Sequence, residues 1–246
     1  MYWIGNSGGT LVGFWLLADK PEYNSKIKAL LQVGPVGVMY HVRGLTRFGL
    51  FWYRILKPVA DFYRHSIGSH EIFSLWPSLY RPLSKICSVV PYLSEEGCRN
   101  FFTFIFGPPS RTFNRTRLPV YLSHFPGGTS TWYFLHMAQM VTHGRAEHMD
   151  HSTAENMRRY GQQTPPIYNY TNIDVPIYLY WGRDDWLTNP DDIQHYIMKN
   201  VKEGLVKGGL EVPGYSHIDF PLAMDNAVKV WNPIANLMRS LENKEM

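Results

Sequence analysis

The stretch that decides the fold is Ile-Gly-Asn-Ser-Gly-Gly at residues 4–9, which contains Gly-x-Ser-x-Gly around Ser7. The short apolar run at residues 2–4 predicts a β-strand before it. Apolar residues then recur at helical spacing as far as Ala18, and residues 19–21 (Asp-Lys-Pro) predict the end of this helix. A serine on a tight turn between a strand and a helix is typical of a catalytic nucleophile. The alternative is a Gly/Ser loop without chemistry, which the flanking strand and helix disfavour.

Candidate partners for Ser7, an acid and a histidine, lie near the other end of the chain. Residues 176–181 (Pro-Ile-Tyr-Leu-Tyr-Trp) predict a buried parallel strand, and Asp184 and Asp185 follow it. His217 comes later, after a predicted amphipathic helix around residues 193–201 and a predicted short strand at 210–212. This spacing returns the chain to the same edge of the sheet. The order serine, acid, histidine therefore predicts a Ser–His–Asp triad on an α/β fold.

These motifs and several longer segments resemble those of the acid lipases, the gastric and lysosomal group of the α/β-hydrolases. The segments are residues 32–36 (Gln-Val-Gly-Pro-Val), 114–124, 126–130 (Pro-Gly-Gly-Thr-Ser), 165–176, 185–187 (Asp-Trp-Leu) and 215–220 (Tyr-Ser-His-Ile-Asp-Phe). The resemblance covers essentially the whole chain. It implies an α/β-hydrolase fold and a carboxylic ester hydrolase of triglycerides or sterol esters, which needs no metal or cofactor.

The resemblance also implies roles for individual residues. Ser7 is expected to attack the ester carbonyl, His217 to take its proton and later activate water, and Asp185 to orient the imidazole. Asp184 is the alternative acid, and the Asp-Trp-Leu triplet favours Asp185. Gly8 is expected to offer its backbone N–H as one of two oxyanion donors.

The chain departs from the family pattern beside the serine and at its beginning. Asn6 and Gly8 stand where the family has His and Gln. Family members also have a long segment before this serine, with early strands and a His-Gly loop that donates the second oxyanion N–H. We therefore expect an α/β-hydrolase fold that lacks its amino-terminal strands and leaves the Ser7 strand at a sheet edge. For this chain alone we expect poor solubility and an activity at least about a hundredfold below that of a complete relative.

Three segments are predicted. Residues 1–38 and 166–246 are expected to form the α/β-hydrolase core, and residues 39–165 an inserted, mostly helical cap and lid. The insertion is aromatic and broken by prolines, as a lipid-facing cap requires, although each aromatic taken singly is better explained by core packing. The final helix is predicted to bury Val228, Trp231, Ala235 and Met238 and to bend at Pro233.

Cysteines and sequons bear on the cellular compartment. Cys87 and Cys98 are too few for a tetrahedral zinc site; in a cytosolic protein they would be buried thiols, whereas the resemblance implies a disulfide in the cap. Sequons at Asn114 and Asn169 match positions where the family has them and predict N-glycosylation. With the resemblance, they imply a lysosomal or secreted protein.

Composition excludes several function classes. With 246 residues, of which 45% are hydrophobic and 18% charged, the chain can build a sizeable core. The net charge of +4 is scattered, which disfavours a nucleic-acid partner, and no apolar run reaches the roughly 18 residues of a membrane span. His143, His148, Asp150 and His151 are clustered, but their spacing fits no metal motif and predicts a solvated face.

The expected partner is therefore a neutral lipid ester at a lipid–water interface, reached by moving a lid. The alternative function is that of a truncated, catalytically inactive lipase-like protein that binds lipid or a partner.

Overall fold

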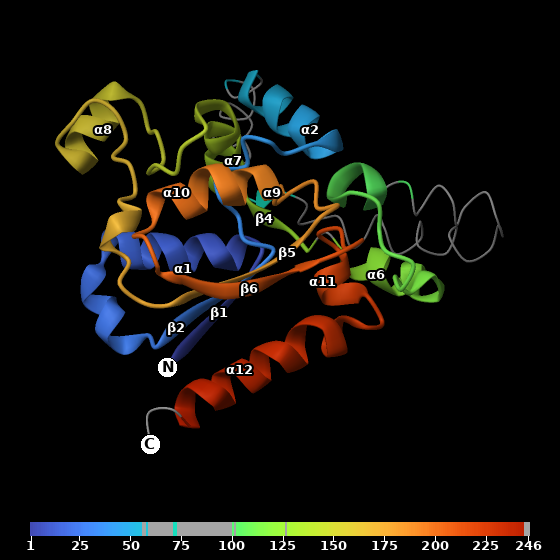
Figure 1. Ribbon diagram of the computed structural model, residues 1–246. Coiled ribbons are helices and arrows are strands. Elements are labelled where there is room, and N and C mark those ends of the chain that lie inside the picture. Colours follow the sequence, from blue (N-terminus) through green and yellow to red (C-terminus); the bar gives the residue numbers. More distant parts are fainter. Residues whose placement is uncertain (56–57, 59–70, 73–99, 101, 126, 244–246) are drawn as a thin grey trace.

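A four-stranded parallel sheet lies at the centre of the computed structural model, which describes residues 1–55, 58, 71–72, 100, 102–125 and 127–243 (Figure 1). The strands are β1 (Tyr2–Asn6), β2 (Ala29–Val33), β5 (Ile177–Gly182) and β6 (Val206–Val212), in the spatial order β1-β2-β5-β6. All three pairings are parallel. The predicted α/β class is confirmed, and the strands predicted at residues 2–4, 176–181 and 210–212 are present.

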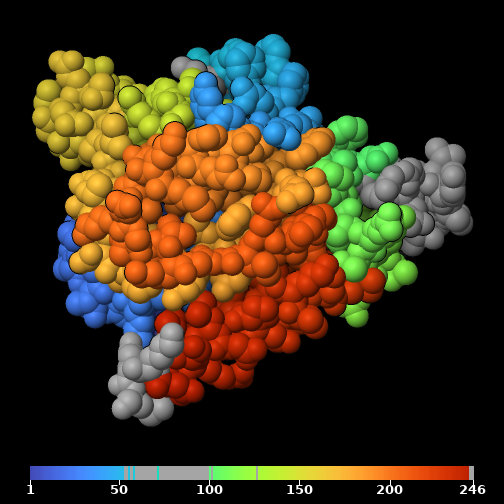
Figure 2. All heavy atoms as spheres, viewed as in Figure 1, coloured from blue at the N-terminus to red at the C-terminus, as the bar shows by residue number. Residues whose placement is uncertain are grey.

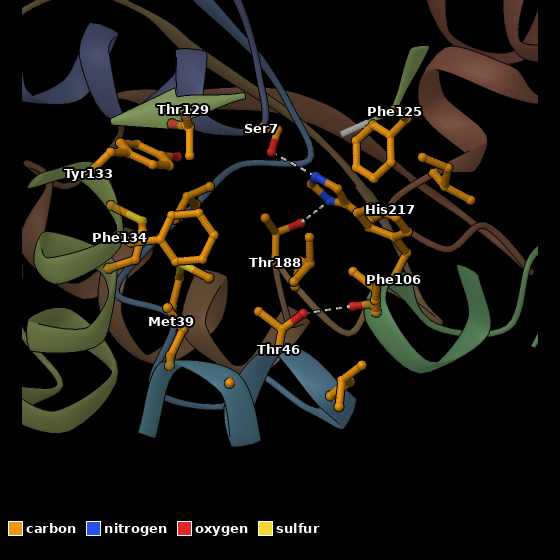
Figure 3. A pocket seen from close by; sticks show the side chains of 18 of the residues that line it. Ser7, Met39, Thr46, Phe106, Phe125, Thr129, Tyr133, Phe134, Thr188 and His217 are labelled. Carbon is orange, nitrogen blue, oxygen red and sulfur yellow. Dashed lines mark hydrogen bonds between the residues drawn. The ribbon is translucent and has the colours of Figure 1, made fainter. Parts of the chain in front are cut away.

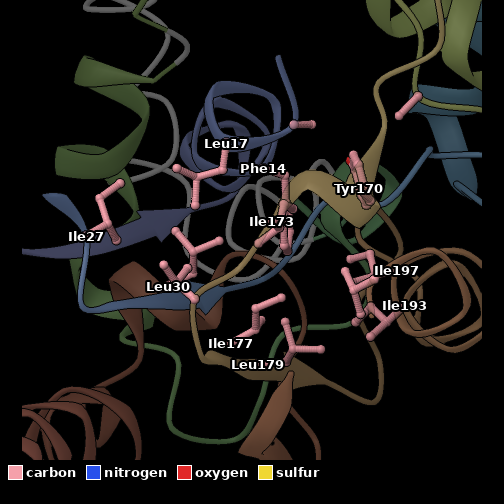
Figure 4. Close-up of a cluster of buried hydrophobic side chains, with 14 of the residues drawn as sticks. Phe14, Leu17, Ile27, Leu30, Tyr170, Ile173, Ile177, Leu179, Ile193 and Ile197 are labelled. Carbon is pink, nitrogen blue, oxygen red and sulfur yellow. The ribbon is translucent and has the colours of Figure 1, made fainter. Parts of the chain in front are cut away.

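Helices cover both faces of this sheet, as parallel strands require. On one face lie α1 (Gly8–Asp19) and a continuous helical segment made of α9 (Pro190–Asp192), the π-helical η4 (Ile193–Ile197) and α10 (Met198–Asn200). Phe14, Leu30, Leu179 and Ile197 pack together in this layer (Figure 4). The helix predicted around residues 193–201 thus begins at Pro190.

The opposite face is covered by the carboxy-terminal helices. They are α11 (Asp219–Leu222), the π-helical η5 (Ala227–Trp231) and α12 (Asn232–Asn243). Tyr180 and Val212 pack there against Val230 and Ile234. In the space-filling view, α12 forms a ridge, coloured red, along this side of the molecule (Figure 2).

The predicted buried face of the final helix is wrong at Val228, whose side chain is 71% exposed. Val230 and Ile234 are buried in its place, with Trp231 and Met238 packed beside them. The physical reason is the π-helical turn, which holds more residues than an α-turn and therefore rotates the following side chains to a different face. Because η5 runs directly into α12, Pro233 lies inside one continuous helical segment, two residues after the π-helical turn. A bend at Pro233 stays a prediction.

The position of β1 at the edge of the sheet agrees with the sequence-based expectation. Its only strand neighbour among the described residues is β2, and Ile4 remains 47% exposed. The five residues of β2, by contrast, are all buried. Ser7 therefore follows an edge strand, and its surroundings are built by β2, β5 and the loops after them.

Between β2 and β5 the described elements are mostly helical. They are α2 (Gly44–Ile55), η2 (Arg115–Arg117), α6 (Leu118–His124), α7 (Thr131–His143), α8 (Thr153–Tyr160) and η3 (Tyr170–Asn172), with β3 (Glu71–Ile72) paired antiparallel to β4 (Thr129–Ser130). The 3-10 turn η1 (Pro21–Lys26) joins α1 to β2. Helices α2 and α7 lie side by side above α1 (Figure 1). The division of the chain at residues 38 and 165 into core and cap stays a prediction.

Cys87 and Cys98 lie outside the described residues, so their pairing stays a prediction. The two sequon asparagines lie at the surface: Asn169 is exposed and Asn114 is half-buried. Each asparagine accepts a hydrogen bond from the threonine of its own sequon, at 2.7 Å in both cases. Glycosylation at these positions also stays a prediction.

Candidate active site

Ser7 occupies the turn between β1 and α1 in a backbone conformation that is rare for a residue with a side chain. Its φ is 53° and its ψ is −123°, which costs conformational energy unless the surroundings hold it. The Ser7 N–H donates to the Val33 carbonyl at 2.9 Å, and the Thr10 hydroxyl donates to the Ser7 carbonyl at 2.6 Å. A Cβ at Gly5 would lie 2.8 Å from the Gly9 carbonyl oxygen, which explains the glycine there. The strained turn projects the Ser7 hydroxyl outward.

The three predicted triad residues form a chain of two contacts, with His217 within hydrogen-bonding distance of both Ser7 and Asp185. Ser7 Oγ is 2.7 Å from His217 Nε2, and His217 Nδ1 is 2.8 Å from Asp185 Oδ2. Asp185 is 1% exposed and His217 is 7% exposed. Figure 3 shows the His217 imidazole beside Ser7, with one ring nitrogen pointing at the Ser7 hydroxyl. This arrangement can pass a proton from the serine hydroxyl to an imidazole whose other nitrogen a carboxylate holds in place.

A glycine makes room for the imidazole. Gly34, directly after β2, has a φ of +53°, and a Cβ there would lie 3.2 Å from His217 Cε1. The serine follows β1, Asp185 follows β5 and His217 follows β6, all at the carboxyl ends of parallel strands. This chain order on a parallel sheet is that of the α/β-hydrolases, and the predicted fold is confirmed in this respect.

The loop that carries Asp185 holds its carboxylate by three further hydrogen bonds. The N–H groups of Leu187 and Thr188 donate to Oδ1 at 2.8 and 2.7 Å, and the Thr188 hydroxyl donates to Oδ2 at 2.6 Å. Asp184, the alternative acid, donates its backbone N–H to the Tyr215 carbonyl instead. Sequence reasoning missed Thr188. A hydroxyl residue three positions after an aspartate is the local signal for such a turn, but it does not by itself mark a functional site.

Replacing Thr188 by valine is expected to lower kcat for ester hydrolysis about tenfold. The substitution keeps the shape of the side chain but removes the hydroxyl that fixes Asp185 Oδ2 against His217. Steady-state kinetics on a soluble ester would measure the change, with Thr188→Ser expected to restore the rate. Full activity of the valine variant would contradict a role for Thr188 in positioning Asp185.

A second buried carboxylate holds the His217 loop. Asp219 accepts hydrogen bonds from the N–H and hydroxyl of Ser110, with the shortest distances 3.0 and 2.7 Å, and from the N–H and hydroxyl of Ser216 at 2.8 and 2.9 Å. Burial raises the pKa of Asp219, and the hydrogen bonds from Ser110 and Ser216 oppose this rise. Asp219 therefore fastens the loop that carries His217 to the segment around Ser110.

We expect Asp219→Ala to lower the free energy of unfolding by about 2–4 kcal/mol, because it leaves two buried backbone N–H groups without an acceptor. Urea denaturation would measure the loss. Asp174→Ala is the matched control, since the Asp174 carboxylate is paired with Lys202 in an exposed ion pair that is expected to contribute little. Equal stability of the two variants would contradict the structural role of Asp219.

Ser7 and His217 open into a cavity of about 650 Å³. Its walls are mostly apolar and come both from the loops around the sheet and from α2 and α7. Larger side chains that line it include Met39, Phe106, Phe125, Tyr133 and Phe134 (Figure 3). A cavity of this size and lining suits a ligand with a long hydrocarbon portion.

The clustered histidines have protein partners. His143 contacts Glu147, His148 Nε2 lies 3.3 Å from Asp19 Oδ1, and Asp150 accepts a hydrogen bond from Asn156 at 2.8 Å. Within the described part of the chain, no three His, Cys, Asp or Glu side chains are grouped so that they could hold a metal ion. No helix among the described residues is long and apolar enough to span a membrane.

Comparison with curated proteins finds lipases. Lipase lipl-1 of Caenorhabditis elegans is 31% identical over 242 residues, which is 98% of this chain and 58% of that protein. Gastric triacylglycerol lipase of Bos taurus is 31% identical over 97% of this chain and 57% of its own length. A putative lysosomal acid lipase/cholesteryl ester hydrolase of Crotalus adamanteus is 30% identical over 98% of this chain and 58% of its own length. The chain thus spans less than two thirds of these relatives.

No protein-family model matches the chain. Among solved structures, the putative non-heme bromoperoxidase BpoC from Mycobacterium tuberculosis H37Rv has a TM-score of 0.47 and 15% identity, covering 97% of this chain and 66% of that chain.

Proposed function

Because this chain is a relative of the gastric and lysosomal acid lipases over nearly its whole length, we propose that it hydrolyses carboxylic esters of neutral lipids at Ser7. The observation that carries the proposal is the continuous contact from Ser7 Oγ to His217 Nε2 and from His217 Nδ1 to Asp185. A buried carboxylate, an imidazole and a serine in this order are the parts that acyl transfer requires.

The proposed reaction proceeds in two halves. His217 Nε2 takes the Ser7 proton while Oγ bonds to the ester carbonyl carbon, and the same proton then leaves with the alcohol as the carbon–oxygen bond breaks. Water, deprotonated by His217, next releases the carboxylic acid from Ser7. Asp185 holds the Nδ1–H of His217 in both halves. The Gly8 N–H, at the start of α1, is proposed as an oxyanion donor.

The cavity favours a neutral ester with a long acyl chain. None of the described residues that line it is Lys or Arg, so it offers no fixed positive charge for a phosphate headgroup. Helix α2, which lines the cavity with Leu45 and Leu50, also carries the exposed aromatic side chains Phe48, Phe51 and Trp52, which suit contact with a lipid–water interface. Triglycerides and sterol esters are the proposed substrates.

The proposed destination is the lysosome or the extracellular space. The relatives named above include gastric and lysosomal acid lipases. The exposed sequon at Asn169 and the half-buried one at Asn114 are compatible with glycosylation on this route.

The proposal is tested by measuring hydrolysis of p-nitrophenyl butyrate, emulsified trioleoylglycerol, cholesteryl oleate and phosphatidylcholine by the purified chain. We expect the three neutral esters to be hydrolysed in preference to the phospholipid, without an effect of EDTA. Binding of lipid emulsions without hydrolysis of any ester would contradict the proposal and favour the alternative, an inactive lipid-binding protein.

A further inference from the structure

Tyr133 brings a hydroxyl from α7 to the backbone beside Ser7. It lies in the first turn of α7, whose start is capped by the Ser130 hydroxyl, which accepts a hydrogen bond from the Trp132 N–H at 3.2 Å. Tyr133 lines the same cavity as Ser7 and His217. Figure 3 shows its hydroxyl end on the side of the cavity where Ser7 lies.

The contact with Gly8 is close. A Cβ built on Gly8 would lie 2.6 Å from the Tyr133 hydroxyl oxygen and 3.5 Å from the ring carbon that carries it, and its three nearest neighbours are Tyr133 atoms. The hydroxyl therefore fills the space that a side chain at position 8 would occupy. It stands next to the residue whose N–H is proposed to stabilise the oxyanion.

We propose that the Tyr133 hydroxyl is a catalytic hydrogen-bond donor to the oxyanion that forms when Ser7 attacks an ester. The inference rests on the proposed function of Ser7 and adds a donor supplied by α7. A phenol has one O–H donor that can rotate toward a developing negative charge. The Tyr133 O–H bond stays intact throughout, because the proton of Ser7 moves to His217.

Two observations favour this role over simple packing. The Tyr133 hydroxyl makes no hydrogen bond with another described residue, so its O–H can donate to an acceptor in the cavity that it lines. Burial also raises the pKa of Tyr133, which keeps the donor proton on its oxygen at neutral pH. An oxyanion at Ser7 would provide the acceptor that the resting cavity lacks.

The test uses p-nitrophenyl esters of alkylphosphonates, whose phosphoryl oxygen takes the place of the ester oxyanion. Ser7 Oγ bonds to phosphorus, the bond to p-nitrophenolate breaks, and the released p-nitrophenolate reports the rate. Tyr133→Phe is expected to slow this reaction about a hundredfold, as for the loss of one oxyanion donor. The matched control is Tyr23→Phe, which removes a phenolic hydroxyl in η1, outside the cavity. It is expected to react at the wild-type rate.

A double-mutant cycle with Gly8→Ala makes the test specific. Alone, Gly8→Ala is expected to slow the reaction at least tenfold, because the new methyl group displaces the Tyr133 hydroxyl. In the Tyr133→Phe background the same substitution is expected to cost less than threefold, since the nearest remaining ring atom is at an ordinary van der Waals distance. Melting temperatures of the four proteins control for unfolding.

The outcomes separate the inference from the proposed function. If the wild-type chain reacts with the phosphonate at Ser7, and Tyr133→Phe reacts as fast as Tyr23→Phe, the role of Tyr133 is overturned and the proposed function stands. If the rate losses of Tyr133→Phe and Gly8→Ala simply multiply in the double variant, the two positions act independently, and the hydroxyl does not act beside Gly8. Failure of the folded wild-type chain to release any p-nitrophenolate would overturn both.

Discussion

Ser7→Ala is expected to lower kcat for ester hydrolysis by about 10⁶, below detection in an ordinary assay, as for the loss of a catalytic serine. Only Oγ is removed, and with it the single contact to His217 Nε2. The strained turn should survive, because the main-chain groups of Ser7 hold it. The Ser7 N–H donates to the Val33 carbonyl, and the Ser7 carbonyl accepts a hydrogen bond from the Thr10 hydroxyl. Hydrolysis of p-nitrophenyl butyrate, together with the melting temperature, measures both expectations.

Ser25→Ala is the control for this substitution. The Ser25 hydroxyl donates to the Glu22 carbonyl at the surface and does not line the cavity, so its loss should leave activity unchanged. Retention of more than a few per cent of the wild-type rate by Ser7→Ala would rule out Ser7 as the nucleophile. A fall in activity accompanied by unfolding would show instead that Ser7 has a structural role.

The sheet and the triad geometry could be anticipated because their signals are local. Each buried strand is a short apolar run, and Gly5 before Ser7 has no room for a side chain: a Cβ there would meet the Gly9 carbonyl and the Gln32 side chain. The positions of Asp185 and His217 after later strands then follow from topology, since parallel strands deliver their carboxyl ends to one edge.

Other features could not be anticipated because they depend on tertiary contacts or on small changes of helical pitch. Tyr133 reaches Gly8 only because α7 packs over the start of α1, which no sequence period reveals. Thr188 acts through the turn that follows Asp185. The predicted burial of Val228 is wrong because α-helical spacing does not hold through a π-helical turn, and this side chain points to solvent instead.

Asp185→Asn is expected to lower kcat by about 10³–10⁴. The Leu187 and Thr188 N–H groups would keep the amide oxygen at the position of Oδ1, which turns the amide NH₂ toward His217 Nδ1. Nδ1 must then accept a hydrogen bond, so Nε2 carries the proton and cannot take one from Ser7.

Asp184→Asn is the matched control, with an expected change of less than about threefold, because Asp184 contributes its backbone N–H, rather than its carboxylate, to the contact with Tyr215. Values of kcat for both variants on p-nitrophenyl butyrate, with melting temperatures to confirm folding, decide between the two acids. The reverse order of effects would assign the acid to Asp184. It would also mean that the loop after β5 rearranges when substrate binds, since of Asp184 and Asp185 only Asp185 lies within hydrogen-bonding distance of His217.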